Sequence, residues 1–82
     1  MKMVFEHLGI ILNGKYISSF DMTDSEVECR IVLWMSNGVK YIFSGDSSNI
    51  SSLSTSLIKS MEDTNEVIFN RTIKSCWYGS MK

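Results

Sequence analysis

The chain has 82 residues, of which 44% are hydrophobic and 21% charged, and its formal net charge at pH 7 is −1. The apolar content is too high for a disordered chain, so we predict one small folded domain over residues 1–82. The small net charge offers no bulk attraction to nucleic acid or to an anionic membrane surface. Since no apolar run is long enough to cross a bilayer, we expect a cytoplasmic protein without a membrane partner.

Residues 3–12 are predicted to form a strand that ends at the pair Asn13-Gly14. Asn and Gly tolerate the positive φ angles of a type I′ turn, so Asn-Gly between apolar runs predicts a two-residue β-hairpin. Its second strand is expected over residues 15–22. The apolar residues of the first segment also fit a helix that stops at Asn13-Gly14. Two element orders therefore stay open, ββββαβ and αβββαβ.

A second pair, Asn37-Gly38, separates two more predicted strands, residues 26–35 and 39–44. A two-residue turn would place Trp34 opposite Tyr41 and would sort the side chains of both strands into two faces. One face would be largely aromatic, with a charged end: Val32, Trp34, Tyr41, Phe43 and Arg30. The other face would be aliphatic: Val27, Cys29, Ile31, Leu33, Met35 and Ile42.

A helix is predicted over residues 48–62, because its apolar residues recur at helical spacing. These residues are Ile50, Leu53, Leu57, Ile58 and Met61. Asp46, Ser47 and Ser48 lie at its start and are suited to cap its first turn. A helix N-terminus also attracts anions, so the same three residues form a candidate site for a phosphate group. A last strand is expected over residues 66–77. The fold class is α+β: a small antiparallel sheet of two Asn-Gly hairpins, one amphipathic helix and a C-terminal strand.

One amphipathic helix can cover only one face of a small sheet, and we expect it on the aliphatic face. The aromatic face then belongs either to a larger core or to an interface, since aromatic residues and arginine dominate the energetics of interfaces. The candidate partner-binding residues are Val32, Trp34, Tyr41, Phe43 and Arg30. The predicted occupant is a protein partner, a second copy of the chain, or both.

Residues suited to catalysis or metal binding are few. His7 is the only histidine, and it has no motif context for acid-base chemistry. Cys29 and Cys76 lack metal-ligand spacing and are expected to be free thiols in a reducing compartment. We therefore expect a protein that is not an enzyme, with no catalytic residue, metal or cofactor.

The chain contains no Ala, Pro or Gln and is rich in Ile, Asn, Lys and Ser. This bias is typical of AT-rich coding, as in phages and mobile elements. The layout resembles small phage-encoded inhibitors, which implies a non-enzymatic protein that blocks a host defence factor by direct contact, in the manner of anti-restriction or anti-CRISPR proteins. Two alternatives stay open: an immunity protein or antitoxin against a toxin, and an oligomeric binder that sequesters a nucleotide signal.

Overall fold

The computed structural model describes residues 2–62 and 65–80, and within them the chain forms seven strands in two sheets and one α-helix. In chain order the elements are β1 (Lys2–Phe5), β2 (Ile10–Asn13), the 3-10 turn η1 (Gly14–Tyr16), β3 (Ile17–Asp24), β4 (Cys29–Met35), β5 (Val39–Gly45), α1 (Ser47–Glu62), β6 (Val67–Phe69) and β7 (Ser75–Ser80). The predicted α+β class is confirmed. The alternative that began with a helix is wrong, because β1 and β2 are strands.

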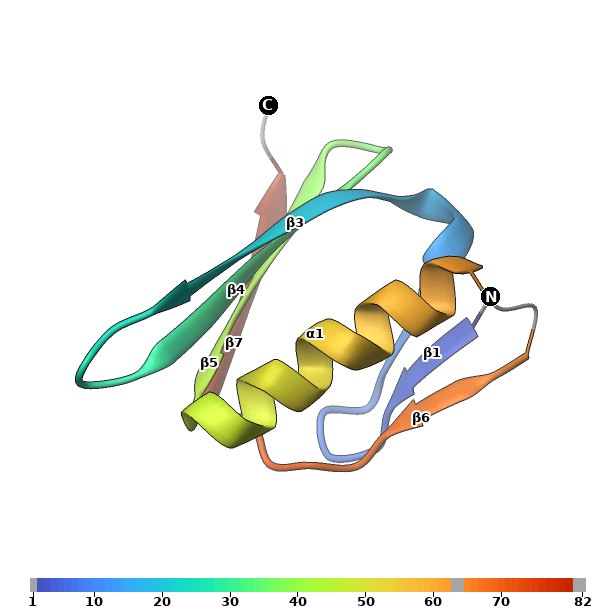
Figure 1. Ribbon diagram of the computed structural model, residues 1–82. Helices are drawn as coiled ribbons and strands as arrows, with labels where there is room; N and C mark the ends of the chain where they lie inside the picture. The colour runs from blue at the N-terminus through green and yellow to red at the C-terminus, as the bar shows by residue number, and fades with distance from the viewer. Residues whose placement is uncertain (1, 63–64, 81–82) are drawn as a thin grey trace.

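The strands are divided between a three-stranded sheet in the order β2-β1-β6 and a four-stranded sheet in the order β3-β4-β5-β7. The pair β1–β6 is parallel and the other pairs are antiparallel. Figure 1 shows α1 and the three-stranded sheet on the same side of the four-stranded sheet. The core lies between these three parts, and its buried side chains are Met3, Phe5, Leu12, Ile17, Cys29, Ile31, Leu33, Phe43, Ile50, Leu53, Leu57, Phe69 and Ile73.

The first predicted strand, residues 3–12, is a hairpin of two short strands, β1 and β2. The amides of Leu8 and Gly9 both donate to the Phe5 carbonyl, at 3.3 and 2.9 Å, which turns the chain back on itself. Gly9 has a φ of +67°, a conformation that residues with a Cβ rarely adopt. The turn therefore depends on a glycine that the sequence places four residues before Asn13.

Asn13-Gly14 does not form the predicted hairpin. Asn13 is extended, with φ −95° and ψ 113°, and its side-chain oxygen accepts a hydrogen bond from the Lys15 amide at 3.0 Å. Asn13 thus caps the turn η1, which carries the chain from β2 in one sheet to β3 in the other. The prediction is wrong because β2 pairs with the preceding strand, β1. The residues after β2 therefore enter the other sheet.

The second Asn-Gly pair does join two strands, but the loop has three residues instead of two. The Gly38 amide donates to the Met35 carbonyl at 3.1 Å, so Ser36 and Asn37 occupy the centre of the turn. Neither residue has a positive φ, whereas Gly38 has a φ of +90°. These features fit a type I turn followed by a left-handed glycine, the usual three-residue hairpin loop. The prediction of a two-residue turn with positive φ at Asn37 is therefore wrong.

The longer loop changes the register between β4 and β5 by one residue. Trp34 lies opposite Lys40, and Leu33 lies opposite Tyr41. The predicted pairing of Trp34 with Tyr41 is wrong, and a shift of one residue moves every side chain of β5 to the other face. Tyr41 and Phe43 consequently share a face with Leu33 and point toward the helix and the three-stranded sheet.

The helix α1 begins one residue earlier than predicted, and the Asp46 carbonyl accepts its first hydrogen bond from the Ile50 amide at 2.9 Å. Ile50, Leu53 and Leu57 are buried as predicted, and so is Ser60. The other two residues of the predicted stripe are not part of the core: Ile58 is 47% exposed and Met61 41%. The buried side of the helix is therefore rotated toward Ser60 relative to the predicted one. The Ser60 hydroxyl donates to the Leu57 carbonyl at 2.8 Å. No helix among the described residues has the length and apolar content to cross a membrane.

The predicted last strand, residues 66–77, is also two strands. β6 extends the three-stranded sheet and β7 extends the four-stranded sheet. The segment between them crosses the N-terminus of α1, where the Asn49 side-chain amide donates to the Thr72 carbonyl at 3.0 Å. The Arg71 guanidinium donates to the Asn49 side-chain oxygen at 3.3 Å. These bonds hold the crossing segment in place and so position β7 at the edge of the larger sheet.

Candidate binding face

The face of the four-stranded sheet turned away from the core is called here the open face. The registers place its side chains in three rows across β3, β4, β5 and β7. The central row is Asp21, Val32, Ile42 and Trp77. The row toward the Asn37-Gly38 loop is Ser19, Trp34, Lys40 and Gly79. The row toward the opposite end is Thr23, Arg30, Ser44 and Ser75. Apolar side chains therefore occupy the middle of the open face, and charged side chains lie around them.

Trp77 lies at the β7 end of the central row and is 53% exposed. Its ring lies over Gly79, since a Cβ built on Gly79 would come within 2.6 Å of the ring. The Lys40 ammonium lies 5.8 Å from the ring centroid, within the range of a cation–π contact. The Trp77 ring thus contacts both Gly79 and Lys40 and still exposes about half of its surface.

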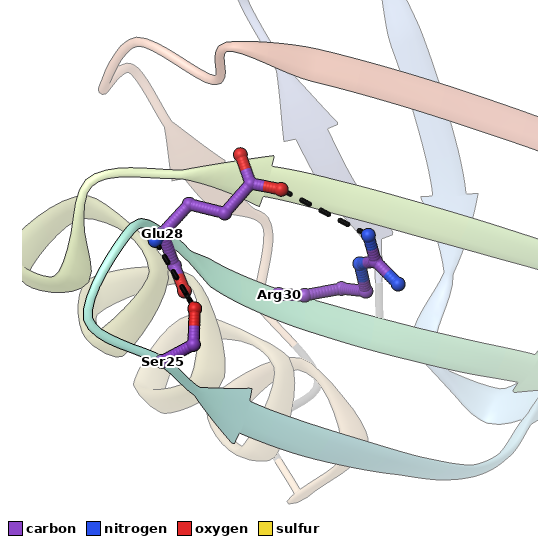
Figure 2. Close-up of polar contacts among 3 residues, drawn as sticks. All are labelled: Ser25, Glu28 and Arg30. Atoms are coloured by element: carbon purple, nitrogen blue, oxygen red, sulfur yellow. Dashed lines mark hydrogen bonds and ion pairs between the residues drawn. The ribbon is translucent and has the colours of Figure 1, made fainter.

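The turn between β3 and β4 forms one end of the open face. The Ser25 hydroxyl donates to the Glu28 carbonyl at 2.7 Å and accepts from the Glu28 amide at 3.2 Å, which closes the turn. Figure 2 shows the Glu28 carboxylate directed toward the Arg30 guanidinium, at 3.8 Å. Val27, predicted to share a face with Cys29, lies in this turn and is exposed.

An open pocket of about 330 Å³ lies beside this turn. Its lining residues are Thr23, Ser25, Glu28, Arg30 and Val32. The exposed ion pair of Arg30 and Glu28 contributes little to stability, because water screens it. The Arg30 guanidinium therefore stays available to a carboxylate or carbonyl group on another molecule.

The predicted site residues are divided between the two faces of the sheet. Val32, Trp34 and Arg30 lie together on the open face. Tyr41 and Phe43 lie on the opposite face, and Phe43 is fully buried. The partner-binding role of the first three stays a prediction, whereas the predicted grouping of all five on one face is wrong because of the register.

Three residues of the open face were missed by reasoning from sequence: Lys40, Ile42 and Trp77. The first two follow directly from the corrected register of the hairpin. The place of Trp77 on the open face could be predicted only by knowing that the last strand pairs with β5. The only local signal for it was a tryptophan in a short strand-forming segment.

Tyr41 and Phe43 have a structural role within a row of stacked rings. The Phe5 and Phe43 ring centroids are 5.2 Å apart, and Phe43 and Tyr41 are 6.0 Å apart. Tyr41 in turn stacks on Tyr78 at 5.7 Å, so the row joins the two sheets and reaches the surface. Burial raises the pKa of the Tyr41 hydroxyl, and Cys76 and Tyr78 raise it further.

The candidate anion site, Asp46, Ser47 and Ser48, lies exposed at the start of α1. Asp46 directly precedes the helix, and its carboxylate disfavours a bound phosphate, so the structure adds nothing in favour of this site. Within the described residues, no group of three or more His, Cys, Asp or Glu side chains is placed to hold a metal ion.

Both cysteines are free. Cys29 is buried in the core and Cys76 is half-buried in β7. Burial raises the pKa of each thiol, and the Asp24 carboxylate adds to the rise at Cys29. Both thiols are therefore neutral and weakly nucleophilic near pH 7.

Comparison of the chain with protein-family models, with curated proteins and with solved structures gives no match. The function of the chain is therefore inferred from its own residues.

Proposed function

We propose that this chain is a small non-enzymatic binding protein that inhibits a larger protein by direct contact through the open face of its four-stranded sheet. The proposed target is a host defence factor in the cytoplasm. The chain would encounter it when a phage infects the host or when a mobile element is transferred. The observation that carries the proposal is the position of Trp34 and Trp77 on a sheet face turned away from α1 and from the three-stranded sheet.

The arrangement of the open face supports a protein partner. Val32, Ile42 and Trp77 lie in one cross-strand row at its centre, and Trp34 lies in the next row. Interfaces combine an apolar centre with a polar rim, and tryptophan and arginine are the residues most enriched among those that dominate binding energy. Val32, Trp34 and Ile42 are half-buried and Trp77 is exposed, and a contiguous apolar patch on a protein surface marks an interaction site.

The rim of the open face favours a partner with polar groups of both signs. Arg30 and Lys40 provide two cations, and Asp21 and Glu28 provide two carboxylates. This mixture supports a specific protein surface over nucleic acid, whose phosphates would require a predominantly basic face.

A phage-plating assay tests the proposal directly. Host cells with and without a restriction or CRISPR system would express the chain, and restored plating on the defended host is the expected result. Trp34→Ala is expected to abolish that restoration, because truncating a central interface tryptophan costs about 2 kcal/mol or more of binding, roughly a thirtyfold loss of affinity.

Ile11→Ala is the control. Ile11 is a 63% exposed apolar residue of β2, which belongs to the three-stranded sheet and not to the sheet that carries the open face, so its truncation should leave the inhibition intact. Circular dichroism must show that both variants are folded. Equal activity of wild type and a folded Trp34→Ala variant would refute the open face as the binding surface. If plating is restored on no defended host, the proposed target class is refuted.

A further inference from the structure

The two sheets have four edge strands, and three of them carry features that discourage pairing with another chain. β2 and β6 are short, with four and three residues. β3 is longer, but it carries Asp21 and Asp24, and its pairing register is shifted between Ile17 and Ser19. Short length, charged side chains and bulges are the devices by which native sheets protect their edges.

The fourth edge strand, β7, has none of these devices. It pairs with β5 over six residues in an unbroken register, from Ser75 to Ser80, and its other side faces no strand among the described residues. Its sequence, SCWYGS, contains no charged residue and no proline. Trp77 and Tyr78 at its centre are 53% and 68% exposed. An unbroken, uncharged and aromatic edge is a template for another strand.

We propose that β7 pairs in antiparallel fashion with β7 of a second copy of this chain, which joins two four-stranded sheets into one of eight strands. This inference does not depend on the proposed function, because it rests on backbone pairing at the edge of the sheet, although Trp77 also belongs to the open face.

A second copy is the occupant that the strand itself favours. If a two-fold axis runs perpendicular to the sheet, one residue of β7 lies opposite the same residue of the second copy. The pairing is longest when that residue is Trp77 or Tyr78, because these two lie in the middle of the strand. No charged side chain lies within β7 to oppose self-pairing. Lys74 precedes the strand, and antiparallel pairing sends the two Lys74 side chains to opposite ends of the contact.

The size of the contact predicts a weak, reversible dimer. Six residues span about 20 Å of strand. Backbone pairing along that length, with two aromatic side chains from each copy, buries less than the roughly 1,200 Å² at which stable interfaces begin. The dimer is therefore expected only at high protein concentration.

Sedimentation velocity over a roughly hundredfold range of concentration tests the pairing, since mass action makes the dimer fraction rise with concentration. Tyr78→Lys should remain monomeric throughout, because two lysines would face each other directly or diagonally. Ser19→Lys adds the same charge to the exposed surface of β3, the opposite edge, and should dimerise like the wild type. A monomer at every concentration, or a dimer that survives Tyr78→Lys, would overturn the proposal.

Amide hydrogen exchange of the unmodified protein provides a second readout that no folding defect can disturb. Outward-facing amides of β7 should gain protection as concentration rises, and those of β3 should not. Unchanged protection in β7 would overturn the proposal. Trp34→Ala separates the two surfaces: an edge dimer persists in this variant, whereas loss of the dimer would indicate pairing of open faces and would count against the edge.

Discussion

Phe43 and Ile42 are neighbours in β5 that test the observed strand register, because their side chains lie on opposite faces of the sheet. Phe43 is fully buried and stacks on Phe5 and Tyr41. Ile42 lies on the open face and is half-buried. The two-residue turn expected from the sequence would exchange these roles. The substitutions Phe43→Ala and Ile42→Ala therefore discriminate between the two registers.

The expected costs differ several-fold. Phe43→Ala removes a buried ring and two ring contacts, at about 4 kcal/mol. Ile42→Ala removes a half-exposed side chain, at about 1 kcal/mol, well below the cost of truncating a fully buried isoleucine. A domain of this size has a total unfolding free energy on the order of 4–12 kcal/mol. Phe43→Ala thus removes a third or more of the stability, and Ile42→Ala only a small part.

Thermal unfolding followed by circular dichroism measures both variants. For a domain of this size, 1 kcal/mol corresponds to a change of about 4–8 °C in Tm. Phe43→Ala should lower Tm by roughly 15–30 °C or leave the chain unfolded, and Ile42→Ala by roughly 4–8 °C. Equal losses, or a larger loss for Ile42→Ala, would refute the register and with it the assignment of the open face.

Three further predictions concern the hairpin loop and the thiols. Gly38→Val should destabilise the fold by about 1 kcal/mol or more in urea denaturation, because valine disfavours the positive φ at this position. No atom lies close to a Cβ built there, so steric crowding adds nothing to this cost. Gly38→Asn should cost less, since Asn tolerates this conformation; equal costs would contradict the explanation. Alkylation without reductant should modify two thiols after unfolding, and Cys76 before Cys29 in the native protein. Burial raises the folded-state pKa of both thiols. The stability that the two protonated thiols contribute to the fold is therefore fully present below the ordinary thiol pKa. It should decline as the pH rises from that value through the folded-state pKa; stability that rises over that interval would contradict it.

Local patterns in the sequence were sufficient for the fold class and for most of the helix. The spacing of Ile50, Leu53 and Leu57 predicted the buried side of α1 because helical periodicity is a local property. The predicted burial of Ile58 and Met61 was wrong, because the exposure of a helix residue depends on which other element packs against it. Neither sheet covers these two residues.

Long-range pairing accounts for the other errors. Asn-Gly serves both two-residue and three-residue loops, so the position of the Asn37-Gly38 turn was predictable but the register was not. Asn13-Gly14 resembles the same signal, yet the preceding strand already had a partner in β1. The division of residues 66–77 between two sheets is set by β1 and β5, which lie far away in the chain. The candidate site changed accordingly, since every face assignment depends on register.

The parallel pairing of β1 with β6 also has a consequence for folding during synthesis. Met3 pairs with Val67, so β1 cannot complete its sheet until a segment much later in the chain has been synthesised. The hairpins β3–β4 and β4–β5 need only local contacts, which form fastest. On a translating ribosome the chain would therefore hold a formed β3–β5 meander while Met3, Phe5 and Leu12 stay uncovered. Phe69 shares the core with these three side chains, so their burial is complete only after that residue has been synthesised.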